Sequence, residues 1–87
     1  RSFLYTLREV EPRPDTLIFL NAGVQLATEG SPVLEDLHAL EEAGLQILVC
    51  GTCLDYFHLK ERVRVGQVSN MYAIAETLLQ AGQTLIF

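Results

Sequence analysis

The chain of 87 residues carries a net charge of −5 at neutral pH, with 6 basic residues against 11 acidic ones. This balance argues against nucleic acid as the main partner, because phosphate binding needs a basic face. The apolar runs are too short to span a membrane, so no membrane partner is expected. Hydrophobic residues make up 49% of the chain, which is enough to build a core in one domain over residues 1–87.

Residues 1–10 are predicted as a helix, because apolar residues recur there at helical spacing. The inward face of this helix consists of Phe3, Leu4, Leu7 and Val10. Prolines at positions 12 and 14 end it, since each removes a backbone donor and restricts its predecessor. The apolar run over residues 17–20 then suits a strand covered on both faces, as in a parallel sheet. Residues 21–23 end that strand.

Ser31 and Pro32 predict the start of the next helix, because serine accepts from free amides and proline suits the first turn. Gly44 is a good stop for this helix. Its predicted buried stripe consists of Val33, Leu34, Leu37, Leu40 and Ala43. A second strand follows over residues 45–49 and reaches Cys50.

The segment over residues 54–65 predicts a short helix from Leu54, followed by an extended stretch over residues 63–65. Ser69 can cap a further helix over residues 70–80, which Gly82 ends. The predicted inward residues of that helix are Met71, Ile74, Ala75, Leu78 and Leu79. Residues 84–87 make a last strand.

Helices and strands thus alternate along the chain. Alternation of this kind predicts an α/β domain of three layers, with a mainly parallel sheet between helices. The helix over residues 1–10 has no strand before it, and the chain begins with Arg1 rather than methionine. We therefore expect a fragment of a longer chain that lacks its first strand.

Polar or reactive residues follow two of the predicted strands, at the sheet edge where ligands gather in open parallel sheets. Asn21 and Gly23 follow the first strand and are candidate ligand-binding residues. Cys50 ends the second, and Gly51 after it lets the chain turn sharply and leaves the thiol accessible. A helix that starts near Leu54 would favour the thiolate, which is a good nucleophile and sulfur carrier.

The two cysteines, Cys50 and Cys53, are candidate catalytic residues, and Gly51, Thr52 and His58 are candidate ligand-binding residues around them. A single close pair fits a reducing cytoplasm better than a secreted disulfide scaffold. The chain has no second ligand pair, so neither a metal nor another cofactor is predicted. Buried cysteines often only pack, and His58 can be a partly exposed histidine on a short helix without a functional role, so both structural interpretations stay open.

A family resemblance is carried by the stretches TLIFLNAGVQLATEGSPVLEDLHALEEAG, ILVCGTCLDYFHLKERVRVGQVSNMY and AETLLQAGQTLIF. Together they resemble the C-terminal domain of YedF-type selenium-metabolism proteins, within the wider DsrE/DsrF/TusD-like family of sulfur-handling proteins. The resemblance implies a flavodoxin-like α/β fold and a homo-oligomer. It also implies a TusA-like sulfur-carrier domain or protein as partner.

In sulfur-relay members of that family, a cysteine at the end of a sheet strand accepts persulfide sulfur. The resemblance places Cys50 at that position, and Cys53 belongs to the CGTC form of the YedF-like group. Relay members carry a basic pair and a glycine after this loop, where this chain has Tyr56, Phe57 and His58.

Three functional hypotheses follow. The first is a sulfurtransferase-like carrier of sulfur or selenium, with a persulfide on Cys50 that Cys53 resolves or shields. The second is a non-catalytic subunit of an oligomer that binds a partner or a small ligand. The third is a dithiol redox module that uses Cys50 and Cys53.

Overall fold

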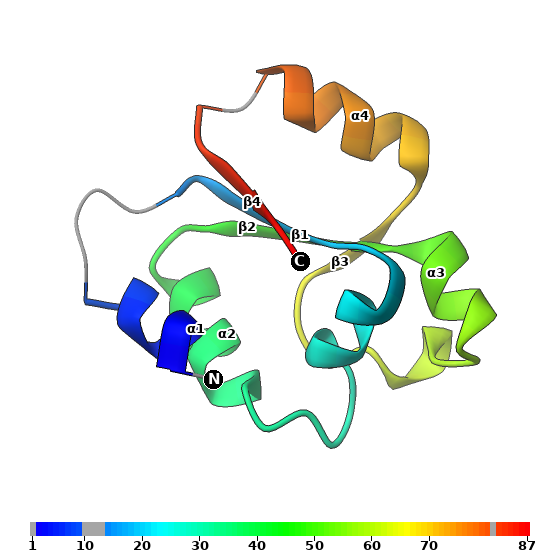
Figure 1. The fold of residues 1–87 in the computed structure, drawn as a ribbon, viewed down its shortest axis with the longest axis horizontal. Helices are drawn as coiled ribbons and strands as arrows, with labels where there is room; N and C mark the ends of the chain where they lie inside the picture. Colours follow the sequence, from blue (N-terminus) through cyan, green and yellow to red (C-terminus); the bar gives the residue numbers. More distant parts are fainter. Residues whose placement is uncertain (1, 10–13, 81) are drawn as a thin grey trace.

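A parallel sheet forms the centre of the molecule (Figure 1). The computed structural model describes residues 2–9, 14–80 and 82–87. Within these residues the sheet has four parallel strands in the order β3-β2-β1-β4. The strands are β1 (Thr16–Phe19), β2 (Gln46–Cys50), β3 (Gln67–Ser69) and β4 (Thr84–Ile86). The predicted α/β fold with a parallel sheet is confirmed.

The helices make the layers above and below the sheet. Figure 1 shows α1 (Ser2–Leu7) and α2 (Leu34–Glu42) on one side of the sheet and α4 (Met71–Gln80) on the other. The short helices η1 (Asn21–Ala27), α3 (Gly51–Tyr56) and η2 (Lys60–Arg62) lie beyond the carboxyl ends of the strands. None of the helices in the described ranges is long and apolar enough to cross a membrane.

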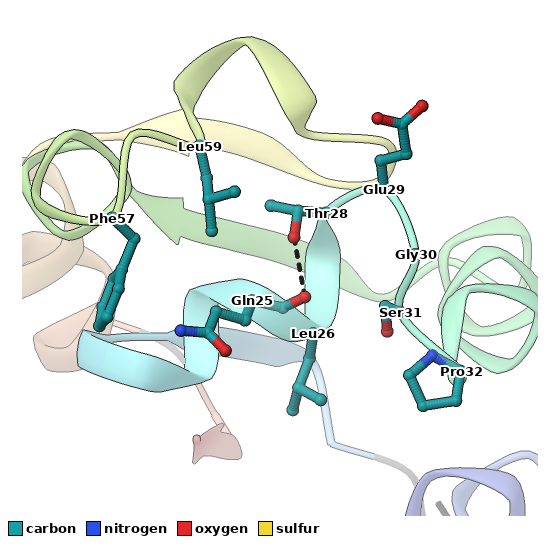
Figure 2. Close-up of a pocket in the computed structure, with 9 residues that line it drawn as sticks. All are labelled: Gln25, Leu26, Thr28, Glu29, Gly30, Ser31, Pro32, Phe57 and Leu59. Atoms are coloured by element: carbon teal, nitrogen blue, oxygen red, sulfur yellow. Dashed lines mark hydrogen bonds between the residues drawn. The ribbon is translucent and has the colours of Figure 1, made fainter.

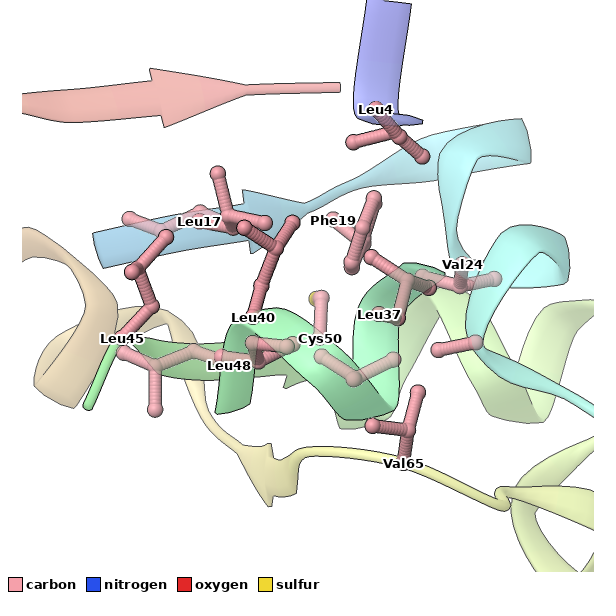
Figure 3. Close-up of a cluster of buried hydrophobic side chains, with 14 of the residues drawn as sticks. Leu4, Leu17, Phe19, Val24, Leu37, Leu40, Leu45, Leu48, Cys50 and Val65 are labelled. Atoms are coloured by element: carbon pink, nitrogen blue, oxygen red, sulfur yellow. The ribbon is translucent and has the colours of Figure 1, made fainter. Parts of the chain in front are cut away.

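The central strand β1 is buried along its whole length, as expected for a strand covered on both faces. It pairs with β2 from Thr16 opposite Gln46 and with β4 from Thr16 opposite Thr84. The core around β1 joins residues of β1 and β2 to residues of α1, α2, η1 and α3 (Figure 3). Its largest fully buried side chains include Phe19, Leu17, Ile18, Leu37, Leu40, Ile47, Leu54 and Ile74.

Helix α1 contacts α2 through its buried residues Leu4 and Leu7. Phe3, predicted to face inward, is 54% exposed, and its ring instead contacts that of Phe87, with centroids 5.9 Å apart. The physical reason is geometric: adjacent helical residues point about 100° apart, so a helix that buries Leu4 turns Phe3 outward. Two predictions lie outside the described residues. They are the inward position of Val10 and the end of the first helix at residues 11–13, before Pro14.

Helix α2 begins at Leu34, later than the predicted start at Ser31. The Ser31 hydroxyl accepts a hydrogen bond from the Val33 N–H at 3.2 Å, so it closes a turn before the helix instead of capping it. Ala43, predicted to be buried, follows the helix and is exposed. Gly44 ends the helix as predicted, with a φ of 106°.

Three short elements were not predicted from the sequence: η1, η2 and β3. Residues 21–27 form the 3-10 helix η1, where the sequence predicts only the end of a strand. Residues 67–69 form β3, whereas residues 63–65 contribute a single bridge between Val63 and Thr28 instead of an extended strand. Helix α3 begins at Gly51, directly after β2, and not near Leu54 as predicted.

Helix α4 lies where the sequence predicts it, but its surroundings differ. Asn70, not Ser69, caps the helix: its Oδ1 accepts a hydrogen bond from the Ala73 N–H at 2.8 Å, while Ser69 ends β3. Of its predicted inward residues only Ile74 is buried. The others, Met71, Ala75, Leu78 and Leu79, are exposed. In the described part of the chain α4 is alone on its side of the sheet, so no second helix covers its apolar stripe (Figure 1).

Candidate functional site

Cys50 is the last residue of β2 and is fully buried. Alternate residues of a strand point to the same face, so the Cys50 side chain points the same way as that of Leu48. Both belong to the core (Figure 3). The prediction that Gly51 leaves the Cys50 thiol accessible is therefore wrong, because the strand continues through Cys50 and carries its side chain inward.

Gly51 allows α3 to start directly against β3. A Cβ at this position would lie 3.2 Å from both the Ser69 carbonyl oxygen and Val68 Cγ1. Gly51 is buried by this contact, whereas Thr52, the next residue, is exposed. The geometry gives Gly51 a packing role, and its ligand-binding role stays a prediction.

Cys53 lies in the first turn of α3 and is partly exposed. Its sulfur accepts a hydrogen bond from the Asn21 backbone N–H, with the nitrogen 3.0 Å from Sγ. The Cys53 S–H in turn donates to Asn21 Oδ1 at 3.9 Å. Residues that follow β1 and β2 thus meet at the carboxyl edge of the sheet, as the parallel arrangement predicts. Both cysteines are free thiols.

Asn21 adopts a left-handed backbone conformation with a φ of 51°. Asparagine is one of the few non-glycine residues that tolerate this region. Two residues on, Gly23 lies against Phe87, and a Cβ at Gly23 would overlap the Phe87 carbonyl group. Gly23 thereby lets the end of the chain pack beside η1, which is a structural reason for a glycine at this position.

The electrostatics of Cys53 combine opposing effects. Burial raises its pKa above the ordinary value of 9.0, the Asn21 N–H lowers it, and the neighbouring Cys50 thiol raises it further. The net pKa is raised. Cys53 is therefore a protonated thiol at neutral pH, and among the effects acting on its sulfur the Asn21 hydrogen bond favours the thiolate.

His58 lies at the far end of α3 from Cys50 and ends that helix. Its N–H donates to the Asp55 carbonyl at 3.0 Å, and the Leu59 N–H donates to the Leu54 carbonyl at 2.8 Å. With a φ of 58° at His58, these two bonds form a Schellman motif. A six-residue helix of about 9 Å separates His58 from Cys50, so the structure gives His58 a capping position away from the thiols.

An open cavity of about 480 Å³, missed from the sequence, lies farther along the contact between η1 and α3 (Figure 2). It is lined by Gln25, Leu26, Thr28, Glu29, Gly30, Ser31, Pro32, Phe57 and Leu59. Glu29 on its rim accepts hydrogen bonds from Arg62 at 2.8 Å and Arg64 at 3.3 Å, and these guanidinium groups lower its pKa. No sequence signal joins its segments, because they are distant in the chain.

Metal ligands do not gather in the described residues, where no group of three or more His, Cys, Asp or Glu side chains could hold an ion. The reactive groups at this edge of the sheet are two thiols, one buried and one partly exposed.

Comparison with known proteins gives one family. The sequence model of the DsrE/DsrF-like family matches residues 7–87, a range that includes all four strands, Asn21 and both cysteines. A search of curated proteins returned no match for the chain. The all-parallel α/β sheet agrees with the flavodoxin-like fold of the family. From the extent of the match we conclude that the chain belongs to the DsrE/DsrF-like family.

Proposed function

We propose that this chain carries sulfur as a cysteine persulfide on the Cys50–Cys53 pair. One observation carries the proposal: the Asn21 N–H lies 3.0 Å from Cys53 Sγ and holds a partly exposed sulfur at the carboxyl edge of the sheet. The family supports the proposal, because DsrE/DsrF members typically form oligomers and work in sulfur relay.

Cys53 is the first sulfur of the pair that a donor can reach, because Cys50 is fully buried. In the loading step the Cys53 thiolate attacks the outer sulfur of a donor persulfide, R–S–SH. The donor S–S bond breaks, a new S–S bond forms on Cys53, and the donor leaves as a thiolate that takes up the proton lost by Cys53. The exchange is redox-neutral and needs no further reactant.

Cys50 is the second thiol of the pair. The family resemblance assigns the persulfide to Cys50, but an outer sulfur on Cys50 would have to fit into a packed core. Cys50 can instead attack the inner sulfur of a Cys53 persulfide, which forms a Cys50–Cys53 disulfide and releases hydrosulfide. In this arrangement Cys53 accepts sulfur and Cys50 resolves it.

The test is intact-protein mass spectrometry after exposure to a small-molecule persulfide donor, on wild type, Cys53→Ser and Cys50→Ala. We expect Cys50→Ala to gain one sulfur atom and Cys53→Ser to gain none. Wild type gains one sulfur atom or, where Cys50 has resolved the persulfide, becomes the disulfide and is lighter by two hydrogen atoms. Loading of Cys53→Ser but not of Cys50→Ala would show that Cys50 carries the persulfide. It would overturn the assignment of Cys53 as the cysteine that accepts sulfur from the donor. Absence of an adduct on all three proteins, with circular dichroism showing each to be folded, would overturn sulfur carriage.

The finer assignments follow from the resemblance to YedF-type proteins. We propose a TusA-like sulfur-carrier domain or protein as the exchange partner, and the cytoplasm as the location, where free thiols such as these stay reduced. A selenium donor would react by the same displacement. Loading the chain with each donor in turn, and then measuring transfer to a TusA-like protein, separates these assignments.

A dithiol redox module is the second candidate function, because two free thiols lie next to each other. The reduction potential of the pair decides between the two. A potential within the range of the thioredoxin and glutaredoxin classes would favour dithiol exchange. A pair that loads sulfur on Cys53, and forms a disulfide only by resolution of that persulfide, would favour the carrier.

A further inference from the structure

We infer that Asn21 is a positioning residue for the sulfur of Cys53: its backbone N–H donates to Sγ, and its carboxamide lies against the same atom. This inference rests on the proposed function, for which it names the group that holds the sulfur-accepting thiol and favours its thiolate. Asn21 does not itself exchange sulfur.

The backbone of Asn21 supports a role in positioning. Within the described ranges two non-glycine residues have a positive φ, Asn21 and His58. At His58 the conformation closes the end of α3. Asn21 begins η1, is separated from the end of β1 by Leu20, and ends no helix. Its left-handed φ instead sets the angle between its N–H and its side chain, so that both groups reach the sulfur of Cys53.

The hydrogen bond acts on the charged form of the sulfur. An N–H donor stabilises a thiolate more than a thiol, because a bond to an ionised acceptor is stronger. The carboxamide serves both forms of the site. Its Oδ1 accepts from the S–H of the resting thiol, and rotation by half a turn presents its N–H₂ group to an anionic sulfur at the same place.

The surroundings leave few other groups that set the charge of Cys53. Neither β1 nor η1 contains a titratable side chain. From the other elements, Cys50 raises the pKa of Cys53, and Asp55 on α3 is paired with Lys60 at 3.3 Å. Asn21 is therefore the residue through which the fold opposes the effect of burial.

Three variants of Asn21 test the inference through the pH dependence of alkylation at Cys53, assigned by tandem mass spectrometry. Asn21→Asp keeps the shape and the N–H but places a carboxylate beside the sulfur, so we expect alkylation at pH 7 to fall about tenfold and the midpoint of the pH profile to rise by about one unit. Asn21→Gly adopts the same φ without strain and keeps the N–H but loses the carboxamide, so we expect alkylation at pH 7 to fall about twofold. Asn21→Val disfavours the left-handed conformation and moves the N–H, so we expect a threefold to tenfold loss.

The matched control is Asn70→Asp, which makes the same charge change at the end of β3 in a residue that caps α4. We expect its alkylation profile to match wild type within about twofold, since screening weakens a charge that does not contact the sulfur. Circular dichroism shows which variants are folded, and Asn21→Asp keeps the test decisive if Asn21→Val is not.

The outcomes separate this inference from the proposed function. If Asn21→Asp leaves the alkylation profile unchanged while wild type loads sulfur, the positioning role is overturned and sulfur carriage stands. If wild type does not load sulfur but the Asn21 variants shift the profile as expected, sulfur carriage is overturned and the effect of Asn21 on the thiol stands. A shift in Asn70→Asp equal to that in Asn21→Asp would also overturn the positioning role.

Discussion

Helices α2 and α4 both connect parallel strands, yet the fold treats them differently. Helix α2 buries Asp36, Leu37 and Leu40, and it contacts α1 and η1 on its side of the sheet. Helix α4 is richer in apolar residues but buries only Ile74. The difference shows that apolar spacing determines which residues can face inward, while neighbouring elements determine whether they are covered.

The largest expected effect separates the two helices directly. Leu37→Ala removes a fully buried side chain of α2 and leaves a cavity, so we expect a loss of about 2–5 kcal/mol in the free energy of unfolding. Leu79 on α4 is 88% exposed, and Leu79→Ala is the matched control, with an expected change below about 0.5 kcal/mol. Urea unfolding measures both, and similar losses in the two variants would contradict the comparison.

The second prediction concerns the ion pair between Arg8, which follows α1, and Asp36 on α2. The Arg8 guanidinium lies 3.0 Å from Asp36 Oδ1, and the Asp36 side chain is fully buried while that of Arg8 is 33% exposed. Arg8→Met keeps much of the side-chain volume but removes the charge partner, so we expect a loss of about 1–3 kcal/mol. Thermal melts of wild type, Arg8→Met and Arg8→Lys measure it. A loss in Arg8→Met no larger than in Arg8→Lys would show that the geometry of the guanidinium group matters more than its charge.

The third prediction compares a buried residue of α4, Ile74, with an exposed residue of the same helix. Ile74 is the buried residue of that helix, at 1% exposure, so Ile74→Val is expected to cost about 0.5–1.5 kcal/mol. Leu78→Val, at a position that is 40% exposed, is the control and is expected to cost less. Equal losses measured by urea unfolding would mean that the whole apolar stripe of α4 is covered in solution.

The smallest expected effect concerns Glu29, in the loop that leads to α2. Arg62 and Arg64 lower its pKa below the ordinary value of 4.5. A lowered pKa in the folded state means that the ion pairs add stability above pH 4.5 and lose it as the pH falls through the folded-state pKa. We expect a small Tm difference between wild type and Glu29→Gln at pH 7, which shrinks under acid or high salt because the pair is exposed. A difference that grows under acid would contradict the assignment.

The sequence predicted the parts of the fold that depend on long apolar patterns. Strands β1 and β2, helix α2 and the parallel sheet all follow from local spacing. Strand β3 did not, because its three residues, Gln67–Ser69, are too few for an alternating pattern to indicate a strand. Helix η1 did not either, because its start depends on Gly23 packing against Phe87, which is distant in the chain.

The sequence predicted that the residues after β1 and β2 meet at one edge of the sheet, but not which of the two thiols is exposed. Parallel strands bring the residues after β1 and β2 to one edge, which is why Asn21 and Cys53 meet. Which cysteine is exposed depends on where β2 ends. Successive side chains of a strand point to opposite faces, so the last residue of β2 determines whether the chain ends on an inward or an outward side chain. Local sequence does not determine that end, so Cys50 was assigned the accessible position that Cys53 holds.

The strand order has a consequence for how the protein is made. The central strand β1 pairs with β4, the last of the described strands in chain order, through registers such as Leu17 opposite Leu85. On a ribosome β1 therefore emerges long before β4, and the edge of β1 that pairs with β4 stays unpaired until then. The pairing of β1 with β4 forms only after β4 has left the exit tunnel. We expect this nascent chain to depend on chaperones until β4 is released.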